Sequence, residues 1–354
     1  MKILACAVGF GLGPCGKLCS LVESNLQHEW YTCGDKIDLS IYSTNPFRDN
    51  CLSKDPDVLR RFVESNNIHC AVDVLDSELA VILKRLGLIV IYIDSIPFVW
   101  TEADLIPRNV DYYCAQKYPG YSRKREGRII RNLIWINPIV CQYTSQLRNN
   151  QIVINFGGLH SPFGEGEEYY LIIMKTLLSV FGKNQIQITG GKNAVELTKR
   201  HYPELHCRTY PHEEFLRLVS SSALFFTSPG LTTIYETCDM DISTVILPPQ
   251  NLSQFYNANI AEKLCRKVCR LDWNTASLSK SSLDRFQSSP EETTVSYIYE
   301  QIRILSEDAS YLEHFSAYAR DRLEKGFKIN QTNLLQKNGV QEISCLLDLI
   351  ARRT

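Results

Sequence analysis

Residues 228–238 read Ser-Pro-Gly-Leu-Thr-Thr-Ile-Tyr-Glu-Thr-Cys and follow a short apolar stretch at 223–226. The apolar stretch predicts a buried strand, and the Ser-Pro-Gly turn predicts that a helix begins directly behind it. Glycine lets the main chain approach a ligand closely, and free N–H groups at a helix start suit a phosphate. Glu236 comes six residues after Gly230, where a carboxylate can accept hydrogen bonds from a vicinal diol such as a ribose. An ordinary strand–helix unit with a Pro-Gly turn is the alternative, because short motifs often match by chance.

A second predicted strand, residues 244–247, ends in Pro248-Pro249, and polar residues open the helix expected behind it. The whole segment resembles the donor-binding segment of glycosyltransferases with the two-domain GT-B fold, in their MurG and UDP-glycosyltransferase branch. The residues that match this pattern are Gly230, Thr233, Glu236, Pro248, Gln254, Asn257 and Ala258. The chain departs from the pattern at Pro229, where many members carry a second glycine or a histidine. The resemblance implies that a nucleotide-sugar donor binds at Ser228, Gly230, Thr233, Glu236, Gln254 and Asn257.

Strand and helix patterns alternate along the first half of the chain. Runs rich in valine and isoleucine, without polar alternation, predict strands buried on both faces and therefore a parallel sheet. Strands are expected at residues 2–8, 30–33, 71–75, 88–93, 111–115 and 133–136, and helices at 14–26, 57–65 and 76–86. The polar stretch 137–150, which contains Pro138, is the expected interdomain linker.

The second half repeats this alternation. Further strands are expected at residues 152–156, 185–189 and 205–210, and helices at 169–181, 194–201 and 213–220. Residues 275–292 predict a surface loop, Cys265 and Cys269 are expected on one helix, and the pattern is helical from Thr294 onward. We therefore expect an α/β protein with two Rossmann-like domains whose parallel sheets face a cleft, residues 1–138 for the acceptor and 150–330 for the nucleotide-sugar. The resemblance adds a C-terminal helix, residues 331–354, that packs back on the first domain.

The composition is that of a globular enzyme and argues against two other classes of protein. A length of 354 residues suggests two domains, and 44% hydrophobic and 22% charged residues are ordinary globular values. The net charge of −1 gives no nucleic-acid footprint, and no apolar run is long enough to predict a membrane span. The short N-terminal apolar run leads into a glycine loop, so it predicts a strand rather than a signal peptide. The 13 cysteines are scattered without a C-x-x-C pair, so we expect reduced thiols and a cytoplasmic location.

A glycine-rich loop follows the first predicted strand. Its G-x-G-x-x-G glycines are Gly11, Gly13 and Gly16. Directly behind a strand, this spacing is also typical of a dinucleotide-binding fingerprint, with Asp35 or Asp38 as the ribose carboxylate. The GT-B resemblance implies instead a loop that faces the acceptor and the sugar, and a plain tight turn remains an alternative. Lys17 is expected either as a charge near this site or as part of a solvated helix surface.

Three loops of the second half follow predicted strands, at the edge where open α/β sheets bind ligands. Their candidate residues are Gly157, Gly158 and His160 in the first loop, Gly190 in the second and His212 in the third. The resemblance implies contacts to the diphosphate in the first loop and to the nucleotide base in the other two, although merely exposed loop histidines would look the same. A zinc site at His201, His206, Cys207 and His212 is not expected, because these residues straddle a helix, a strand and a loop.

Residues 94–104 combine aromatic and acidic side chains behind a buried strand. At the carboxyl edge of the first sheet, Phe98 and Trp100 would stack on a flat acceptor, and Asp94 or Glu102 would deprotonate it. A carboxylate beside aromatic rings in a water-poor site has a raised pKa, which suits general-base chemistry near neutral pH. A hydrophobic turn with solvated acids is the alternative.

This run, together with Cys114-Ala115-Gln116, resembles the cytosylglucuronate synthases of nucleoside-antibiotic pathways, GT-B enzymes that join cytosine or hydroxymethylcytosine to UDP-glucuronic acid. We therefore expect a glycosyltransferase that moves a sugar from a UDP-sugar to a small acceptor. No cofactor and no metal are expected, since no Asp-x-Asp pair lies beside the end of a predicted strand. A nucleotide-sugar epimerase and a non-catalytic nucleotide-sugar-binding protein are the alternatives.

Overall fold

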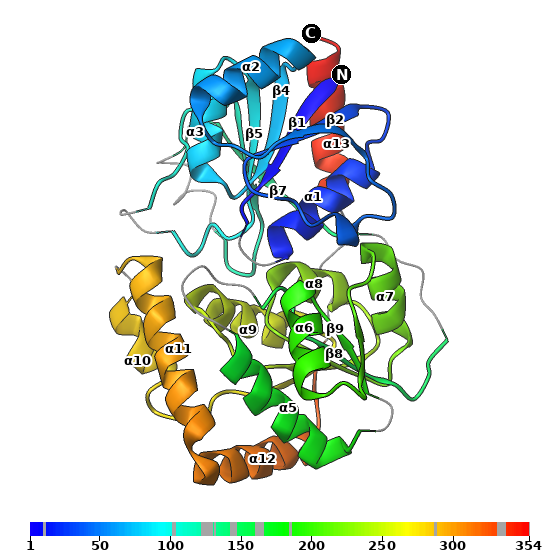
Figure 1. Ribbon diagram of the computed structural model, residues 1–354, viewed down its shortest axis with the longest axis vertical. Coiled ribbons are helices and arrows are strands. Elements are labelled where there is room, and N and C mark those ends of the chain that lie inside the picture. Colours follow the sequence, from blue (N-terminus) through cyan, green and yellow to red (C-terminus); the bar gives the residue numbers. More distant parts are fainter. Residues whose placement is uncertain are drawn as a thin grey trace. The chain divides into compact units, whose positions relative to one another are not determined.

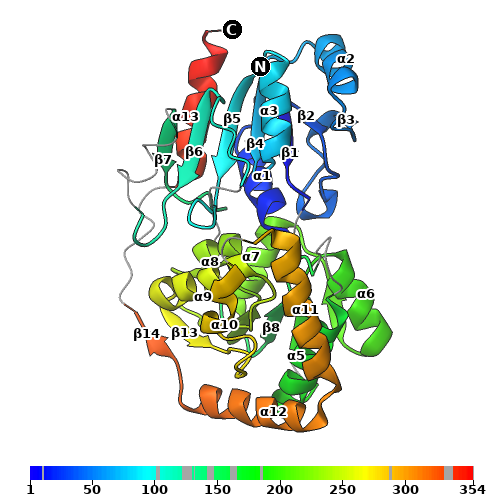
Figure 2. The same ribbon diagram turned by 90° about the vertical axis from the view of Figure 1, so that its left-hand side faces the viewer.

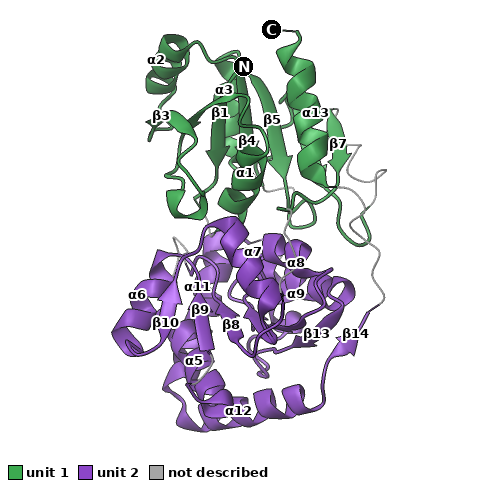
Figure 3. Cartoon of the chain, turned by 90° about the vertical axis from the view of Figure 1, so that its right-hand side faces the viewer, with its two compact units in different colours: residues 1–141, 335–354 green, residues 142–334 purple. Residues whose placement is uncertain are grey.

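The computed structural model describes residues 1–9, 12–100, 104–121, 130, 132–141, 147–159, 166–183, 186–286, 289–330 and 338–353. The chain divides into two compact units, residues 1–141 with 335–354 and residues 142–334 (Figure 3). Within the described residues, each unit contains one seven-stranded sheet with helices on both faces (Figures 1 and 2). Of the candidate site residues, Gly11, Glu102 and His160 lie outside the described residues.

The described strands of the first unit form a parallel sheet in the order β3-β2-β1-β4-β5-β6-β7. They are β1 (Lys2–Ala7), β2 (Glu29–Cys33), β3 (Phe47–Cys51), β4 (Cys70–Val74), β5 (Ile89–Asp94), β6 (Tyr112–Gln116) and β7 (Leu133–Ile136). β1, β4 and β5 are buried almost throughout, which is why their residues are mostly apolar. The strand order reverses between β1 and β4, and doubly wound sheets bind ligands outside the carboxyl ends of the strands at such a point.

Among the described residues, two helices cover each face of this sheet. α1 (Gly13–Glu23) and α13 (Gly339–Ala351) share a core with β4 through Val72, whereas α2 (Pro56–Asn66) and α3 (Ser77–Arg85) share the opposite core with Ala71. Glu342 of α13 accepts hydrogen bonds from the backbone N–H and the side-chain amide of Asn137, at 2.6 and 2.9 Å. The C-terminal helix therefore belongs to the first unit (Figure 3).

The second unit has the same strand order, β10-β9-β8-β11-β12-β13-β14. Its strands are β8 (Ile152–Asn155), β9 (Ile186–Thr189), β10 (His206–Arg208), β11 (Leu224–Thr227), β12 (Ser243–Ile246), β13 (Lys267–Arg270) and β14 (Lys328–Ile329). All of these pairings are parallel except that of β14, which runs antiparallel to β13. The order reverses between β8 and β11, so the two loops behind these strands occupy the ligand-binding position of this sheet.

Helices also cover both faces of the second sheet. They are α5 (Glu167–Phe181), α6 (Lys192–His201), α7 (His212–Ser221), α8 (Leu231–Thr237), α9 (Leu252–Leu264), α10 (Lys280–Leu283), α11 (Glu291–Glu307) and α12 (Ala309–Glu324). α5, α6, α11 and α12 share one core with Phe226 of β11. The preceding residue of β11, Phe225, points to the opposite face of the sheet and packs against Phe215 of α7, with ring centroids 6.3 Å apart.

The prediction of two α/β units with parallel sheets is confirmed, and four local predictions are wrong. β3 was missed because it is a polar edge strand. Cys269 lies in β13 rather than on a helix, and Cys265 is the C-cap residue directly behind α9. The expected surface loop contains α10, with Leu283 buried, and the expected helical C-terminal part contains β14.

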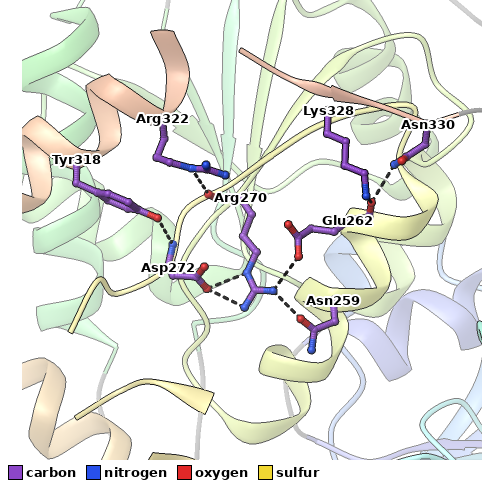
Figure 4. Close-up of polar contacts among 8 residues, drawn as sticks. All are labelled: Asn259, Glu262, Arg270, Asp272, Tyr318, Arg322, Lys328 and Asn330. Atoms are coloured by element: carbon purple, nitrogen blue, oxygen red, sulfur yellow. Dashed lines mark hydrogen bonds and ion pairs between the residues drawn. The ribbon is translucent and has the colours of Figure 1, made fainter. Parts of the chain in front are cut away.

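A polar network connects α9 with the residues around β13 and β14 (Figure 4). Arg270 at the end of β13 donates to Asn259 and Glu262 of α9, at 2.6 and 3.1 Å, and to Asp272 at 2.7 and 2.8 Å. The side-chain amide of Asn330 donates to the last carbonyl groups of α9, including that of Glu262 at 2.9 Å. The bonds of Asn330 attach the end of β14, a two-residue strand that its own sequence would not specify, to α9.

Candidate functional site

The ends of β8 and β11 form the centre of the candidate site in the second unit. Asn155 and Thr227 end these strands as register partners, and the Asn155 amide donates to the Thr227 hydroxyl at 3.2 Å. The Asn155 side-chain oxygen accepts from the Gly157 N–H at 3.0 Å, and its carbonyl accepts from the Ser228 N–H at 2.9 Å. Gly157 has φ +63°, a left-handed conformation that favours glycine. The structure therefore brings the predicted residues Gly157, Gly158 and Ser228 together on neighbouring strand ends.

Buried polar groups contact the turn from Ser228 to Gly230 on its protein side. The Ser228 hydroxyl lies 3.3 Å from the hydroxyl of Tyr169 and 3.5 Å from the side-chain amide of Gln250. Tyr169 also donates to the carbonyl of Pro248 at 3.0 Å. A Cβ built on Gly230 would meet no atom closer than 3.9 Å, so the main chain is open where α8 begins. This combination of a fixed turn and free space suits a ligand group that comes close to the backbone.

Two predicted donor residues of α9 have structural partners. The amide of Asn257 donates to the carbonyl of Pro229 at 3.0 Å, and its buried side-chain oxygen has no hydrogen-bond partner within the described structure. The side-chain oxygen of Gln254 accepts from the backbone N–H of Gln250 at 2.8 Å. Asn257 thus fixes the turn at Pro229, and Gln254 fixes the loop behind β12.

Glu236 and His212 form a buried pair across two neighbouring helices. His212 Nε2 of α7 lies 2.8 Å from Glu236 Oε1 of α8, and the two side chains are 9% and 1% exposed. Thr233, one turn before Glu236, is only partly buried. The pattern in the sequence identified both members of the pair but not their contact. Glu236 can bind a ribose only if its buried carboxylate first becomes accessible to the ligand.

Gly190 lies at the same sheet edge, and its lack of a side chain serves packing. A Cβ at this position would lie 2.7 Å from Ala194 Cβ and 2.9 Å from the carbonyl oxygen of Gly157. The neighbouring Gly191 N–H donates to that same carbonyl at 2.8 Å. Gly190 therefore allows the loop behind β9 to approach the Gly157 turn.

In the first unit, the glycine-rich segment is helical earlier than expected. α1 begins at Gly13 with Leu12 as its N-cap, and the Gly16 N–H donates to the Leu12 carbonyl at 2.8 Å. Lys17 is 1% exposed, so its interpretation as a solvated helix surface is wrong. Gly13, Gly16 and Lys17 therefore lie within the first turns of α1, behind the carboxyl end of β1.

The two acidic residues considered for a dinucleotide ribose have local partners. Asp35 Oδ2 accepts from the Gly9 N–H at 2.9 Å and pairs with Lys54 at 3.2 Å. Asp38 caps the short 3₁₀ helix η1 (Leu39–Ile41) through its bond to Ser40. Both carboxylates therefore stabilise loops of the first unit.

Asp94, the last residue of β5, accepts three hydrogen bonds. Its Oδ1 accepts from the Ile96 N–H at 3.0 Å, and its Oδ2 accepts from the Trp100 indole at 2.9 Å and the Tyr113 hydroxyl at 2.7 Å. Asp94 is 1% exposed, and burial raises its pKa to about 6 against the opposing effect of these bonds. The alternative of solvated acids is therefore wrong at Asp94.

Phe98 belongs to a cluster of four aromatic rings behind β5 and β6. Its ring centroid lies 5.0 Å from that of Tyr118, and Tyr121 lies 4.9 Å from Trp135 of β7. Tyr118 and Trp135 connect the two pairs at 6.3 Å. All four side chains are partly exposed. Sequence analysis missed Tyr118, Tyr121 and Trp135, although aromatic residues behind the next strand were a usable signal.

We also searched the described part of the chain for metal-ligand groups, membrane-spanning helices and disulfides. It contains no group of three His, Cys, Asp or Glu side chains placed to hold a metal ion, and no helix there is long and apolar enough to cross a membrane. All 13 cysteines are free thiols. Two Asp-x-Asp stretches have structural uses, since Asp55 caps α2 and Asp241 pairs with Arg148 and Lys267.

No protein-family model matches the chain, and no curated protein matches it. Several solved structures are similar in fold. The UDP-GlcNAc 2-epimerase from Neisseria meningitidis, bound to UDP-GlcNAc, is 12% identical over 99% of this chain and 100% of its own, with a TM-score of 0.55. The UDP-GlcNAc 2-epimerase from Methanocaldococcus jannaschii, in complex with UDP-GlcNAc and UDP, is 10% identical over 87% and 100%, with a TM-score of 0.52.

Arabidopsis thaliana UGT89C1, complexed with UDP-L-rhamnose, is 12% identical over 90% of this chain and 99% of its own, with a TM-score of 0.50. Identities at this level show the fold alone, and the strand orders of both units agree with that fold. The chain therefore has the GT-B fold, with two Rossmann-like α/β units.

Proposed function

We propose that the chain is a metal-independent glycosyltransferase that moves a sugar from a UDP-sugar to a small acceptor. The observation that carries this proposal is the strand-order reversal between β8 and β11, which places the turns of Gly157 and Ser228 side by side, close to the helix that bears Glu236. The solved structures of similar fold were determined with UDP-GlcNAc and UDP-L-rhamnose. The finer proposal is UDP-glucuronate as donor and a cytosine-type base as acceptor, as in nucleoside-antibiotic biosynthesis.

In this proposal the donor binds to the second unit. The diphosphate approaches the open main chain at Gly230 and the hydroxyl of Ser228, and Glu236 accepts hydrogen bonds from the ribose diol. His212 keeps the Glu236 carboxylate in one orientation through its contact at 2.8 Å. Gln254 and Asn257 hold the surrounding loops, and Thr233 and Gly158 complete the donor contacts.

The reaction is an attack of the deprotonated acceptor on the anomeric carbon, with UDP as the leaving group. Fixed hydrogen-bond donors at the diphosphate stabilise the charge that develops there, and this replaces the divalent metal that other transferases use. Asp241 and Asp55, the acids of the two Asp-x-Asp stretches, are engaged in ion pairing and helix capping, which supports the proposal. Of the two candidate bases, Asp94 already accepts three hydrogen bonds, which leaves Glu102, outside the described residues, as the remaining candidate.

A nucleotide-sugar epimerase is the second candidate. It is favoured by the UDP-GlcNAc 2-epimerase of Neisseria meningitidis, which matches the chain over nearly the whole length of both. A non-catalytic nucleotide-sugar-binding protein would share the donor site and tolerate the loss of every candidate carboxylate.

The first experiment is a thermal-shift screen against UDP-, TDP-, GDP- and CMP-sugars. A ligand at about a hundred times its Kd stabilises the fold by about 2.7 kcal/mol, which raises the melting temperature measurably. Because the proposed donor is a UDP-sugar, the UDP-sugars should raise it most. No shift with any UDP-sugar would contradict the proposed donor. Product analysis with donor alone then separates the epimerase, which needs no acceptor, from the transferase.

A further inference from the structure

We infer that Asp94 is a positioning residue which ties the loop of residues 95–100 to the neighbouring strand β6. Its three hydrogen bonds reach the beginning of the loop at Ile96, the end of the loop at Trp100, and the neighbouring strand at Tyr113. One carboxylate therefore connects two points of the loop with the sheet. This inference concerns the fold of the loop, and only its catalytic consequence rests on the proposed function.

The geometry leaves Asp94 unsuited to exchange a proton with an acceptor. A general base must come within hydrogen-bond reach of the group that it deprotonates. Asp94 is buried, and its Oδ2 is already occupied by the donors of Trp100 and Tyr113. An acceptor would have to displace one of these side chains before it could touch the carboxylate.

The loop that Asp94 holds carries the aromatic side chains at the carboxyl edge of the first sheet. Within it, the Val99 N–H donates to the Ile96 carbonyl at 3.0 Å, so the anchored residues form a closed turn. Phe98 lies on this turn and packs against Tyr118. Fixing both ends of the turn fixes the position of Phe98, and a small displacement of this contact surface weakens acceptor binding without any change in the chemistry.

The titratable groups that face Asp94 lie on its own strand and on the elements packed against it. Tyr92 on the same strand and Tyr113 on β6 both have pKa values raised by burial. α3 contributes the hydroxyl of Ser77, which lies 2.8 Å from that of Tyr92, and β4 contributes Asp73, the register partner of Tyr92. Burial also raises the pKa of Asp73 well above its usual range. A titration seen at Trp100 in the weakly acidic range is therefore assigned to Asp94 only if Asp94→Asn abolishes it.

Hydrogen–deuterium exchange of the peptides covering residues 95–100 tests the anchor directly. We expect Asp94→Asn to speed exchange there by about ten- to hundredfold, because hydrogen bonds to a charged group are lost. Tyr113→Phe removes one donor and should give a smaller increase, which keeps the test valid if the first variant is poorly folded. Asp38→Asn is the matched control and should leave this loop unchanged. Equal exchange in the wild type and Asp94→Asn would overturn the inference.

Tryptophan emission between about pH 5 and pH 7 gives a second readout that is independent of any substrate. The wild type should show a transition near pH 6 that disappears in Trp100→Phe and in Asp94→Asn. A transition that persists unchanged in Asp94→Asn would overturn the inference.

Kinetics separate this inference from the proposed function. For 4-amino-pyrimidine acceptors such as cytosine, Asp94→Asn should raise the acceptor KM by about tenfold and leave kcat within a few-fold of the wild type. A fall in kcat of roughly 10²–10⁴-fold with unchanged loop exchange would identify Asp94 as the base and overturn the inference. If the wild type turns over no nucleotide-sugar, the proposed function fails, and the exchange and emission experiments still decide the role of Asp94.

Discussion

Replacing Asp94 with asparagine should make the stability of the first unit less dependent on pH. Burial raises the pKa of Asp94 from its ordinary 3.8 to about 6, so the folded protein holds this proton over a range of pH where the unfolded chain has lost it. The stability that Asp94 contributes is thus fully present below about pH 4 and is lost as the pH rises through 6. A shift of about two units corresponds to about 3 kcal/mol.

Urea denaturation of the wild type and Asp94→Asn at several values between about pH 4 and pH 7 measures this effect. Trp30, Trp100 and Trp135 lie in the first unit and make tryptophan fluorescence a suitable probe. The free energy of unfolding of the wild type, minus that of the variant, should fall by about 3 kcal/mol across this range. Taking the difference cancels the titration of all other groups, including Asp73. A difference that stays constant or grows with pH would refute the reasoning.

Four further predictions concern the donor site, the metal and the polar network of Arg270. Glu236→Ala should weaken UDP binding by roughly 2–3 kcal/mol in calorimetry, because a ribose diol loses a charged acceptor; unchanged affinity would remove the assignment. His212→Ala should lower the preference for UDP over 2′-deoxy-UDP, since the carboxylate loses its partner at 2.8 Å, and an unaltered preference would speak against this role. Turnover should persist in EDTA. If EDTA abolishes turnover and magnesium or manganese restores it, the reaction requires a divalent metal. Arg270→Met should lower the stability of the second unit against urea by roughly 1–3 kcal/mol, because the side chain is only 14% exposed and its loss leaves the carboxylates of Glu262 and Asp272 without their partner. Lys325→Met, at an exposed ion pair, is the control and should change this stability by less than about 1 kcal/mol.

The sheets could be predicted from the sequence because doubly wound sheets bury their central strands on both faces. β1 and β5 read as continuous apolar runs for this reason, whereas the edge strand β3, with three exposed residues, carries no such signal. The four-residue spacing of Cys265 and Cys269 imitates a helix, but α9 ends at Leu264 and the chain continues as a strand. β14 depends on contacts that come from distant parts of the chain, such as the bonds of Asn330 to α9. Periodicity cannot reveal contacts of this kind.

The site shows the same division between local pattern and tertiary contact. The turns of Gly157 and Ser228 could be placed because residues behind neighbouring parallel strands meet at one sheet edge. The pairing of Glu236 with His212 joins residues 24 positions apart on two helices, and no spacing rule predicts it. The sequence identified Asp94 as an unusual carboxylate. The hydrogen bond that it accepts from Tyr113, on the next strand, favours a positioning role over that of a general base, and this contact cannot be read from the sequence of the loop.

The central claim, transfer of a sugar from a UDP-sugar to an acceptor, is tested most directly by mass spectrometry of the products. The protein is incubated with UDP-glucuronate or UDP-GlcNAc, each with and without cytosine, hydroxymethylcytosine or cytidine monophosphate. We expect UDP and a glycoside to appear together, and only when an acceptor is present. Formation of an epimer or free sugar from the donor alone, at a rate that the acceptors do not change, would contradict transfer and favour the epimerase.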